Sequence, residues 1–313
     1  MQSYEFLIYI LAFIGVWIGS GLVVTSVLKI AHSLKASSFI ISFLILGFLT
    51  SLTEVGVAIN SYARQELEIS VGNLLGGIVV LFLLIIPLLA IAGNGIKLQH
   101  SFHKSNLLLS LIILSLPGIF MIDAHLGLRE SIILVAGYIV IAGLMIFSTA
   151  NGKEHTVTNK TKHKLEILIL KIIIGIAILL LSTNYIVEQT IKIAELIGVS
   201  SFLVSLLMLS LGTNLPELSV AMRSILQGKK EVAFGNYLGS AVFNVLILGV
   251  LGMINDRITV DSNFYIIVAT TVFGLTGFYF FATSKKELSR KEGLLLILLY
   301  VVFLVLELSF RHS

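Results

Sequence analysis

The chain has 313 residues, of which 57% are hydrophobic and only 12% are charged, and its mean hydropathy is +1.03. A soluble domain is usually about a quarter charged because water must wet its surface, so this composition predicts an all-α integral membrane protein in a lipid bilayer. The absence of cysteine excludes disulfides, thiolate metal sites and cysteine nucleophiles.

Ten apolar runs follow one another along the chain, and a transmembrane helix needs roughly 20 predominantly apolar residues. No positively charged segment precedes the first run, so we expect it to be retained as a helix and not removed as a signal peptide. Taking the polar breaks as loops predicts spans near residues 5–28, 36–62, 69–93, 105–122, 130–149, 165–187, 199–224, 231–254, 263–283 and 291–309.

The loops between these spans alternate in charge. Every second loop is basic, and the loops between are acidic or mixed. By the positive-inside rule the basic loops are cytoplasmic, and both termini lie on the outer side of the cytoplasmic membrane. The pI near 9.2 does not indicate nucleic acid, because the basic residues are spread over these short loops. The basic loops contain Lys29 and Lys35; Lys97 and Lys104; Lys153, Lys160, Lys162 and Lys164; Arg223, Lys229 and Lys230; and Lys285, Lys286, Arg290 and Lys291.

The second half of the chain repeats the first at a constant offset of 163 residues. The segment TSLTE at 50–54 matches TNLPE at 213–217, and GNLLG at 72–76 matches GNYLG at 235–239. Each half holds five spans, an odd number, so the copies run in opposite directions, as in many secondary transporters. We therefore predict ten transmembrane helices in two inverted five-helix repeats, residues 1–149 and 165–313, joined by a cytoplasmic linker at 150–164.

Two glutamates, Glu54 and Glu217, are the only acidic residues placed deep within apolar spans. Each lies ten residues before a loop, which is roughly 15 Å at a rise of about 1.5 Å per residue, or half of a ~30 Å membrane core. An ionisable group at this depth is a functional hypothesis by default. The alternative is a glutamate held only by structural hydrogen bonds, which explains one copy more easily than two.

The residues before each glutamate offer neutral oxygen atoms. Thr50 and Ser51 precede Glu54 by three or four residues, as Thr213 and Asn214 precede Glu217, and this spacing places them on the same helical face. Carboxylate, hydroxyl, amide and carbonyl oxygens suit Ca²⁺ or Na⁺ better than soft metals. No histidine falls at mid-span, so zinc chemistry is not expected.

Helices 2 and 7, which carry the glutamates, are predicted to be broken. Pro216 removes one helical hydrogen bond and frees a carbonyl near Gly212. Thr53 stands at the equivalent position of the first half, so a break there has to depend on Gly47 and the hydroxyl residues.

The glycine motifs that begin at Gly72 and Gly235 have two interpretations. Glycines four residues apart allow close helix packing, whereas the paired asparagines and equal spacing from the glutamates favour a position lining the site. Ser240 and Asn244 reach the depth of Glu217, but their counterparts Gly77 and Leu81 offer no side-chain oxygen.

On these residues the chain resembles the calcium/cation antiporter superfamily, especially the prokaryotic sodium/calcium exchangers, whose repeats read close to G-[TS]-S-L-P-E and G-N-x-x-G-[ST]. The second copy matches well and the first less well. The resemblance implies an exchanger that binds ions between helices 2, 3, 7 and 8 and needs no cofactor. It implies Ca²⁺ binding by Thr50, Glu54, Thr213 and Glu217, and Na⁺ binding by the backbone oxygens of Gly47 and Ser210 with the side chains of Ser51, Asn214, Ser240 and Asn244.

The leading hypothesis is antiport of Ca²⁺ against Na⁺ by alternating access. Two facing carboxylates without a cation repel each other and favour uptake of a proton, so proton-coupled exchange is the alternative. An intramembrane enzyme that uses the carboxylates as acid and base is a remote alternative, because no Asp, His or Cys at mid-span completes a catalytic group. A channel is a third, although an occluded site suits two buried acids better than a pore lined by rings of charge.

Overall fold

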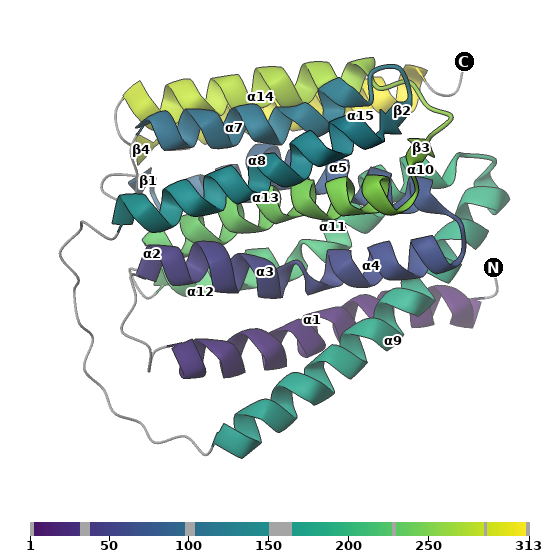
Figure 1. Cartoon of the computed structure of the whole chain (residues 1–313), viewed down its shortest axis with the longest axis horizontal. Helices are drawn as coiled ribbons and strands as arrows, with labels where there is room; N and C mark the ends of the chain where they lie inside the picture. Colours follow the sequence, from purple (N-terminus) through teal and green to yellow (C-terminus); the bar gives the residue numbers. More distant parts are fainter. Residues whose placement is uncertain are drawn as a thin grey trace.

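The computed structural model describes residues 3–31, 38–97, 104–149, 165–226, 230–284 and 287–310. These residues form a bundle of helices whose axes run mostly in one direction, with short strand pairs near its ends (Figure 1). The linker predicted at 150–164 lies entirely outside these residues, as do several of the loop lysines.

The first half runs from a long peripheral helix into a series of shorter ones. Its elements are α1 (Ser3–Ala31), α2 (Ser38–Ile40), the π-helix η1 (Ile41–Leu46), α3 (Gly47–Thr50), α4 (Leu52–Ala63), α5 (Leu67–Val80), the π-helix η2 (Leu81–Ile85), α6 (Ile86–Ala92), β1 (Ile96–Lys97), α7 (Lys104–Phe120), β2 (His125–Gly127) and α8 (Leu128–Thr149).

The second half follows a closely similar order. Its elements are α9 (Leu165–Ile197), α10 (Ser201–Val204), the π-helix η3 (Ser205–Leu209), α11 (Ser210–Thr213), α12 (Leu215–Leu226), α13 (Lys230–Ile254), β3 (Arg257–Thr259), α14 (Tyr265–Ser284), β4 (Glu287–Leu288) and α15 (Arg290–Phe310).

The interruptions of the helices recur at the offset found in the sequence. A single residue separates α3 from α4 at Ser51 and α11 from α12 at Asn214, and both have ψ near zero (3° and 6°). The path bends by 40° at Ser51. A π-helix precedes each interruption, and π segments often mark functional sites. The halves differ in the next span, since η2 interrupts the first copy whereas α13 continues without a break.

The strand pairs join the two halves at opposite ends of the bundle (Figure 1). β1 pairs with β4 in antiparallel register at one end, with Ile96 opposite Leu288. β2 pairs with β3 at the other end, with Leu126 opposite Ile258. Each pair takes one strand from each half and so ties the halves together outside the helical core.

Two peripheral helices, α1 and α9, cross each other along one side of the bundle (Figure 1). They approach closely at a pair of glycines: a Cβ on Gly19 would lie 2.8 Å from the carbonyl oxygen of Gly175, and a Cβ on Gly175 would lie 2.7 Å from that of Gly19. The hydroxyls of Tyr9 and Thr190 also lie 3.2 Å apart. These contacts make α1 and α9 a closely packed pair.

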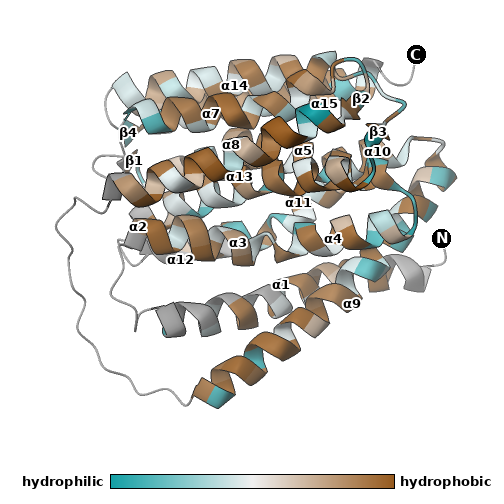
Figure 2. Ribbon diagram, in the orientation of Figure 1, coloured by the Kyte–Doolittle hydropathy of each residue, from teal (hydrophilic) through white to brown (hydrophobic). Residues whose placement is uncertain are grey.

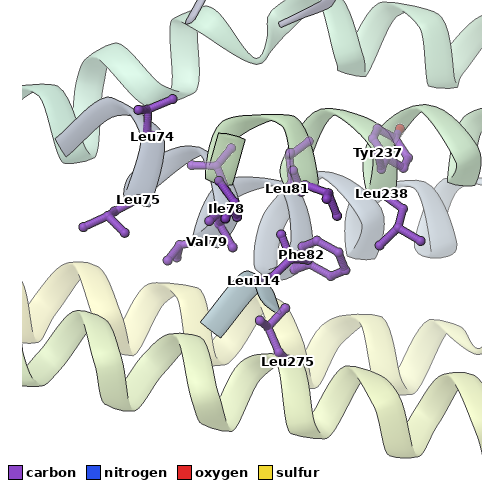
Figure 3. Close-up of a cluster of buried hydrophobic side chains, with 14 of the residues drawn as sticks. Leu74, Leu75, Ile78, Val79, Leu81, Phe82, Leu114, Tyr237, Leu238 and Leu275 are labelled. Carbon is purple, nitrogen blue, oxygen red and sulfur yellow. The ribbon is translucent and has the colours of Figure 1, made fainter. Parts of the chain in front are cut away.

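The largest hydrophobic cluster lies on the opposite side of α4 and α12 from this pair. It centres on α5 and η2, where Leu74, Ile78 and Phe82 pack against neighbours that include Leu114 and Leu275 (Figure 3). A helix that is apolar on all sides belongs in an interior, and α5 is buried around nearly its whole circumference.

Hydrophobic residues also make up much of the outer helices (Figure 2), and many of their large apolar side chains are exposed. Phe147 is 76% exposed and Leu181 is 73% exposed, which is unfavourable in water and ordinary against lipid. Within the residues that the structure describes, seven helices are long and apolar enough to cross a membrane, or eight if Ile41–Thr50 and Leu52–Ala63 form one bent span. Shorter apolar helices cover Leu7–Val23 and Lys104–Phe120, so ten spans stay a prediction that depends on counting these two.

The sixth span extends further than the sequence predicts. Charged residues from Glu188 to Glu195 suggest a loop after residue 187, but α9 continues to Ile197. The Lys192 ammonium lies 3.1 Å from the Glu188 carboxylate one turn away, and Gln189, Thr190 and Ala194 form a buried face. The charges therefore lie on the outer face of a helix that still buries its inner face.

Candidate cation-binding site

Each glutamate lies in the first turn of a helix that begins directly after an interruption. Glu54 is in the first turn of α4 and Glu217 in the first turn of α12. Backbone N–H groups at a helix N-terminus have no partner within the helix and favour negative charge nearby. The local fold thus places both carboxylates where the backbone stabilises an anion.

All ten predicted site residues are buried. Nine are at most 1% exposed, and Gly47 is buried at the start of α3. The nine are Thr50, Ser51, Glu54, Ser210, Thr213, Asn214, Glu217, Ser240 and Asn244.

Hydrogen bonds that cross between the halves bring the two interruptions together. The Thr50 hydroxyl donates to Asn236 Oδ1 at 3.2 Å, and the Thr213 hydroxyl donates to Asn73 Oδ1 at 2.9 Å. Each interruption is therefore held by side chains of the opposite half.

Each carboxylate has one hydroxyl donor and one oxygen left over. The Thr53 hydroxyl donates to Glu54 Oε2, and the Ser240 hydroxyl donates to Glu217 Oε1 at 2.8 Å. Glu54 Oε1 and Glu217 Oε2 are buried and have no hydrogen-bond partner in the described part of the chain. Buried polar atoms are nearly always hydrogen-bonded, so these two oxygens are available to a cation.

The charges of the two glutamates are not balanced by basic side chains. Glu54 and Glu217 are close enough to interact electrostatically. No lysine or arginine is buried among the residues whose burial the structure describes. A buried carboxylate without a partner is costly, so the pair needs a bound cation or protons.

The glycine motifs pack the backbones of the two halves closely together. A Cβ on Gly239 would lie 2.0 Å from the Phe43 carbonyl oxygen of η1, and one on Gly76 would lie 2.3 Å from the Leu206 carbonyl oxygen of η3. The glycines therefore pack the two halves closely together, and Asn73 and Asn236 of the same motifs contact the threonines.

The two halves differ on the far side of the glutamates. Ser240 bonds Glu217, and its hydroxyl lies 2.8 Å from that of Ser51. Its counterpart Gly77 has no side chain, and a Cβ there would lie 3.0 Å from Asn244 Nδ2 and 3.2 Å from Asn214 Nδ2. The amide groups of Asn214 and Asn244 thus lie beside Gly77, whereas the equivalent place in the other half holds the hydroxyls of Ser51 and Ser240.

Position 81 is equally different from its counterpart. Leu81 belongs to the hydrophobic cluster of Figure 3, whereas both amide atoms of Asn244 are buried without a hydrogen-bond partner in the described residues. The first half therefore lacks side-chain oxygens at positions 77 and 81, whereas the second half has them at Ser240 and Asn244.

Four residues were not among the predicted site residues. Asn73 and Asn236 contact the threonines, and their pairing in the repeat was the available signal. Thr53 contacts Glu54, although the sequence marks this position only by the threonine that stands in place of proline. Glu307, in the last turns of α15, is a third fully buried acid, so Glu54 and Glu217 are not the only buried carboxylates.

Comparison with known proteins gives consistent results for both halves. Residues 4–147 and 167–308 match the family described as sodium/calcium exchanger protein. CaxA of Alkalimonas amylolytica is 27% identical over 288 residues, covering 87% of this chain and 89% of that protein. The sodium/calcium exchanger MaX1 of Methanosarcina acetivorans is 30% identical over 138 residues, 44% of this chain and 39% of that protein.

A solved structure has the same fold. The sodium-calcium exchanger NCX_Mj, from crystals soaked with Na⁺ and Sr²⁺, superposes with a TM-score of 0.71 at 23% identity, covering 97% of this chain and 99% of that one.

Proposed function

This chain belongs to the sodium/calcium exchanger family, and we propose that it exchanges Ca²⁺ for Na⁺ across the cytoplasmic membrane by alternating access. The observation that carries this function is the pair Glu54 and Glu217, buried together without a buried lysine or arginine in the described chain. Two negative charges are neutralised by one Ca²⁺ or shared among monovalent cations.

The proposed ligands are hard oxygen atoms, which suit Ca²⁺ and Na⁺. Ca²⁺ would bind the carboxylates of Glu54 and Glu217 with oxygens of Thr50 and Thr213. Na⁺ would use the same carboxylates together with neutral oxygens. These neutral ligands are the backbone oxygens of Gly47 and Ser210 and the side chains of Ser51, Asn214, Ser240 and Asn244.

Antiport follows from competition for the two carboxylates. They cannot hold Ca²⁺ and a full set of monovalent ions at once, so one cargo leaves as the other binds. A site that opens to one side at a time then couples the two flows. The peripheral pair α1 and α9 packs against the interrupted helices, and its movement would expose the site to either side.

The proposed topology has ten spans in two inverted repeats, residues 1–149 and 165–313. The second and seventh spans are broken helices. The linker at 150–164 would be cytoplasmic and both termini outside. The equal offset between the interruptions at Ser51 and Asn214 supports this arrangement, as does the match of each half to the family. The first residue of α1 and the last residue of α15 lie at the same end of the bundle (Figure 1), as expected if both termini are on one side of the membrane.

Proton-coupled exchange is the second candidate, and a specific observation favours it. Gly77 and Leu81 supply no side-chain oxygen where the second half has Ser240 and Asn244, so fewer neutral ligands remain in the first half for Na⁺. Protons need no such ligands, because they bind the carboxylates directly. The proteins named for an activity among the relatives are exchangers, which gives no support to the enzyme alternative.

Calcium flux into proteoliposomes tests both candidates. We expect an outward sodium gradient, at equal pH on both sides, to drive accumulation of ⁴⁵Ca²⁺. Liposomes without protein and a sodium ionophore serve as controls. Accumulation driven only by a pH gradient would favour the proton-coupled exchanger, and no accumulation under either gradient would contradict calcium antiport.

A further inference from the structure

Thr53 is the position in the glutamate segment where the first half departs from the proline of the second half, Pro216. Its side chain is fully buried. The Thr53 hydroxyl oxygen lies 3.0 Å from the Thr50 carbonyl oxygen and 3.2 Å from the Thr213 carbonyl oxygen. It also contacts Glu54 Oε2.

These three neighbours are all acceptors, and the hydroxyl has one proton. One proton can be shared between acceptors but cannot fully satisfy all three, so these oxygens are left with less hydrogen bonding than they can accept. Thr50 and Thr213 are the last residues of α3 and α11, where helical hydrogen bonding stops and carbonyl groups lack their usual partners. A hard cation among these oxygens would relieve their repulsion.

The same residue compensates for what the first half lacks. In the second half, Ser240 supplies a hydroxyl to Glu217 from the facing helix α13. In the first half, the equivalent position is Gly77, and the hydroxyl that reaches Glu54 comes from Thr53 on α4 itself. Each carboxylate therefore keeps one hydroxyl partner, supplied by a different element.

We propose that the Thr53 hydroxyl is an additional ligand for the transported cation. It would form a subsite of four oxygens with Glu54 and the carbonyl groups of Thr50 and Thr213. This role deepens the proposed function, because it assigns to the exchanger a ligand that Pro216 cannot supply in the other half. The subsite would hold dehydrated Ca²⁺ between carbonyls from both halves.

The test compares Thr53→Val, which keeps the shape and removes the oxygen, with Thr53→Ser, which keeps the oxygen. Equilibrium binding of ⁴⁵Ca²⁺ to the purified full chain in detergent is measured for each. We expect Thr53→Val to weaken Ca²⁺ binding about tenfold, the effect of losing an interaction with a charged group, and Thr53→Ser to stay within about twofold. Wild-type affinity in Thr53→Val, or equal weakening in both variants, would overturn the proposal.

A second pair of variants moves the hydroxyl to the facing helix. Proline is tolerated in the first turn of a helix, so Thr53→Pro tests loss of the oxygen without relying on valine. Adding Gly77→Ser to Thr53→Pro should restore most of the Ca²⁺ affinity, and failure of this restoration would contradict the compensation. Because binding is measured without transport, a wild-type protein that binds Ca²⁺ but does not exchange it would contradict the proposed function and leave this comparison valid.

Discussion

The two halves of the molecule share one frame but do not share one set of side chains. The frame is repeated closely: both interruptions follow a π-helix, and glycines of each half pack against the backbone of the other. Around the carboxylates, Ser240 and Asn244 stand opposite Gly77 and Leu81 in the repeat. The close contact between the backbones of the two halves leaves no room for a side chain at these glycines. A hydroxyl group, in contrast, can reach a carboxylate from more than one helix.

The largest expected effect falls on the feature that both halves share. Glu54→Gln and Glu217→Gln each remove one of the two negative charges that would neutralise Ca²⁺, so a bound Ca²⁺ would keep an uncompensated positive charge in a buried site, which is costly. We expect both variants to abolish ⁴⁵Ca²⁺ exchange in proteoliposomes while still inserting. Glu195→Gln, at an exposed acid of α9, is the matched control. Sustained exchange in both glutamate variants would remove these residues from the site.

The frame can be tested at equivalent glycines. Gly76→Ala and Gly239→Ala each place a Cβ against a carbonyl oxygen of the opposite half, at 2.3 Å and 2.0 Å before relaxation. We expect each to lower stability by about 1–3 kcal/mol, the usual cost of overpacking, measured as a lower thermal unfolding midpoint in detergent. Gly143→Ala, where a Cβ meets nothing within 4 Å, is the control. An effect in one half alone would show that the packing is not equivalent.

Unequal effects are expected where the halves differ. Ser240→Ala removes the hydroxyl that contacts both Glu217 and Ser51. It should raise the Na⁺ concentration needed for half-maximal calcium flux roughly tenfold, the effect of losing a hydrogen bond to a charged group. The reciprocal variant Gly77→Ser with Leu81→Asn restores polar side chains to the first half. It should alter sodium dependence, and no change would mean that positions 77 and 81 do not line the sodium path.

The smallest effect is expected at an exposed contact of the peripheral helices. Arg64, which follows α4, lies 3.7 Å from Glu188 and 3.1 Å from Asn184 on α9. Both side chains of the ion pair are partly exposed, and such pairs contribute at most about 1 kcal/mol. Arg64→Gln should change the rate of ⁴⁵Ca²⁺ exchange less than threefold, about 0.6 kcal/mol. A larger loss would indicate that this contact controls the movement of α9.

Much of this architecture could be predicted because membrane helices depend on local apolar runs. The helical class and the sodium/calcium exchanger family are confirmed, and helices lie close to the predicted spans. The predicted end of the sixth span was wrong, because charged residues on one face of a helix cannot be distinguished from a polar loop in the sequence alone. The spans, inversion and termini stay predictions.

The candidate site was predictable to the extent that the repeat marks it. Glu54 and Glu217 were found because each occurs at mid-span, and all ten predicted residues are buried. The contact between Thr53 and the Thr213 carbonyl could not be predicted, because it joins residues 160 positions apart. Glu307 was missed because depth along a helix does not reveal which side faces the protein interior.

Competition between cations for the purified protein tests the central claim most directly. If Glu54 and Glu217 form one site, the wild type should bind one Ca²⁺ per chain, and increasing Na⁺ at constant pH should displace it completely. Two independent Ca²⁺ sites, or Ca²⁺ binding that Na⁺ leaves unchanged, would contradict a single pair of carboxylates that exchanges the two ions.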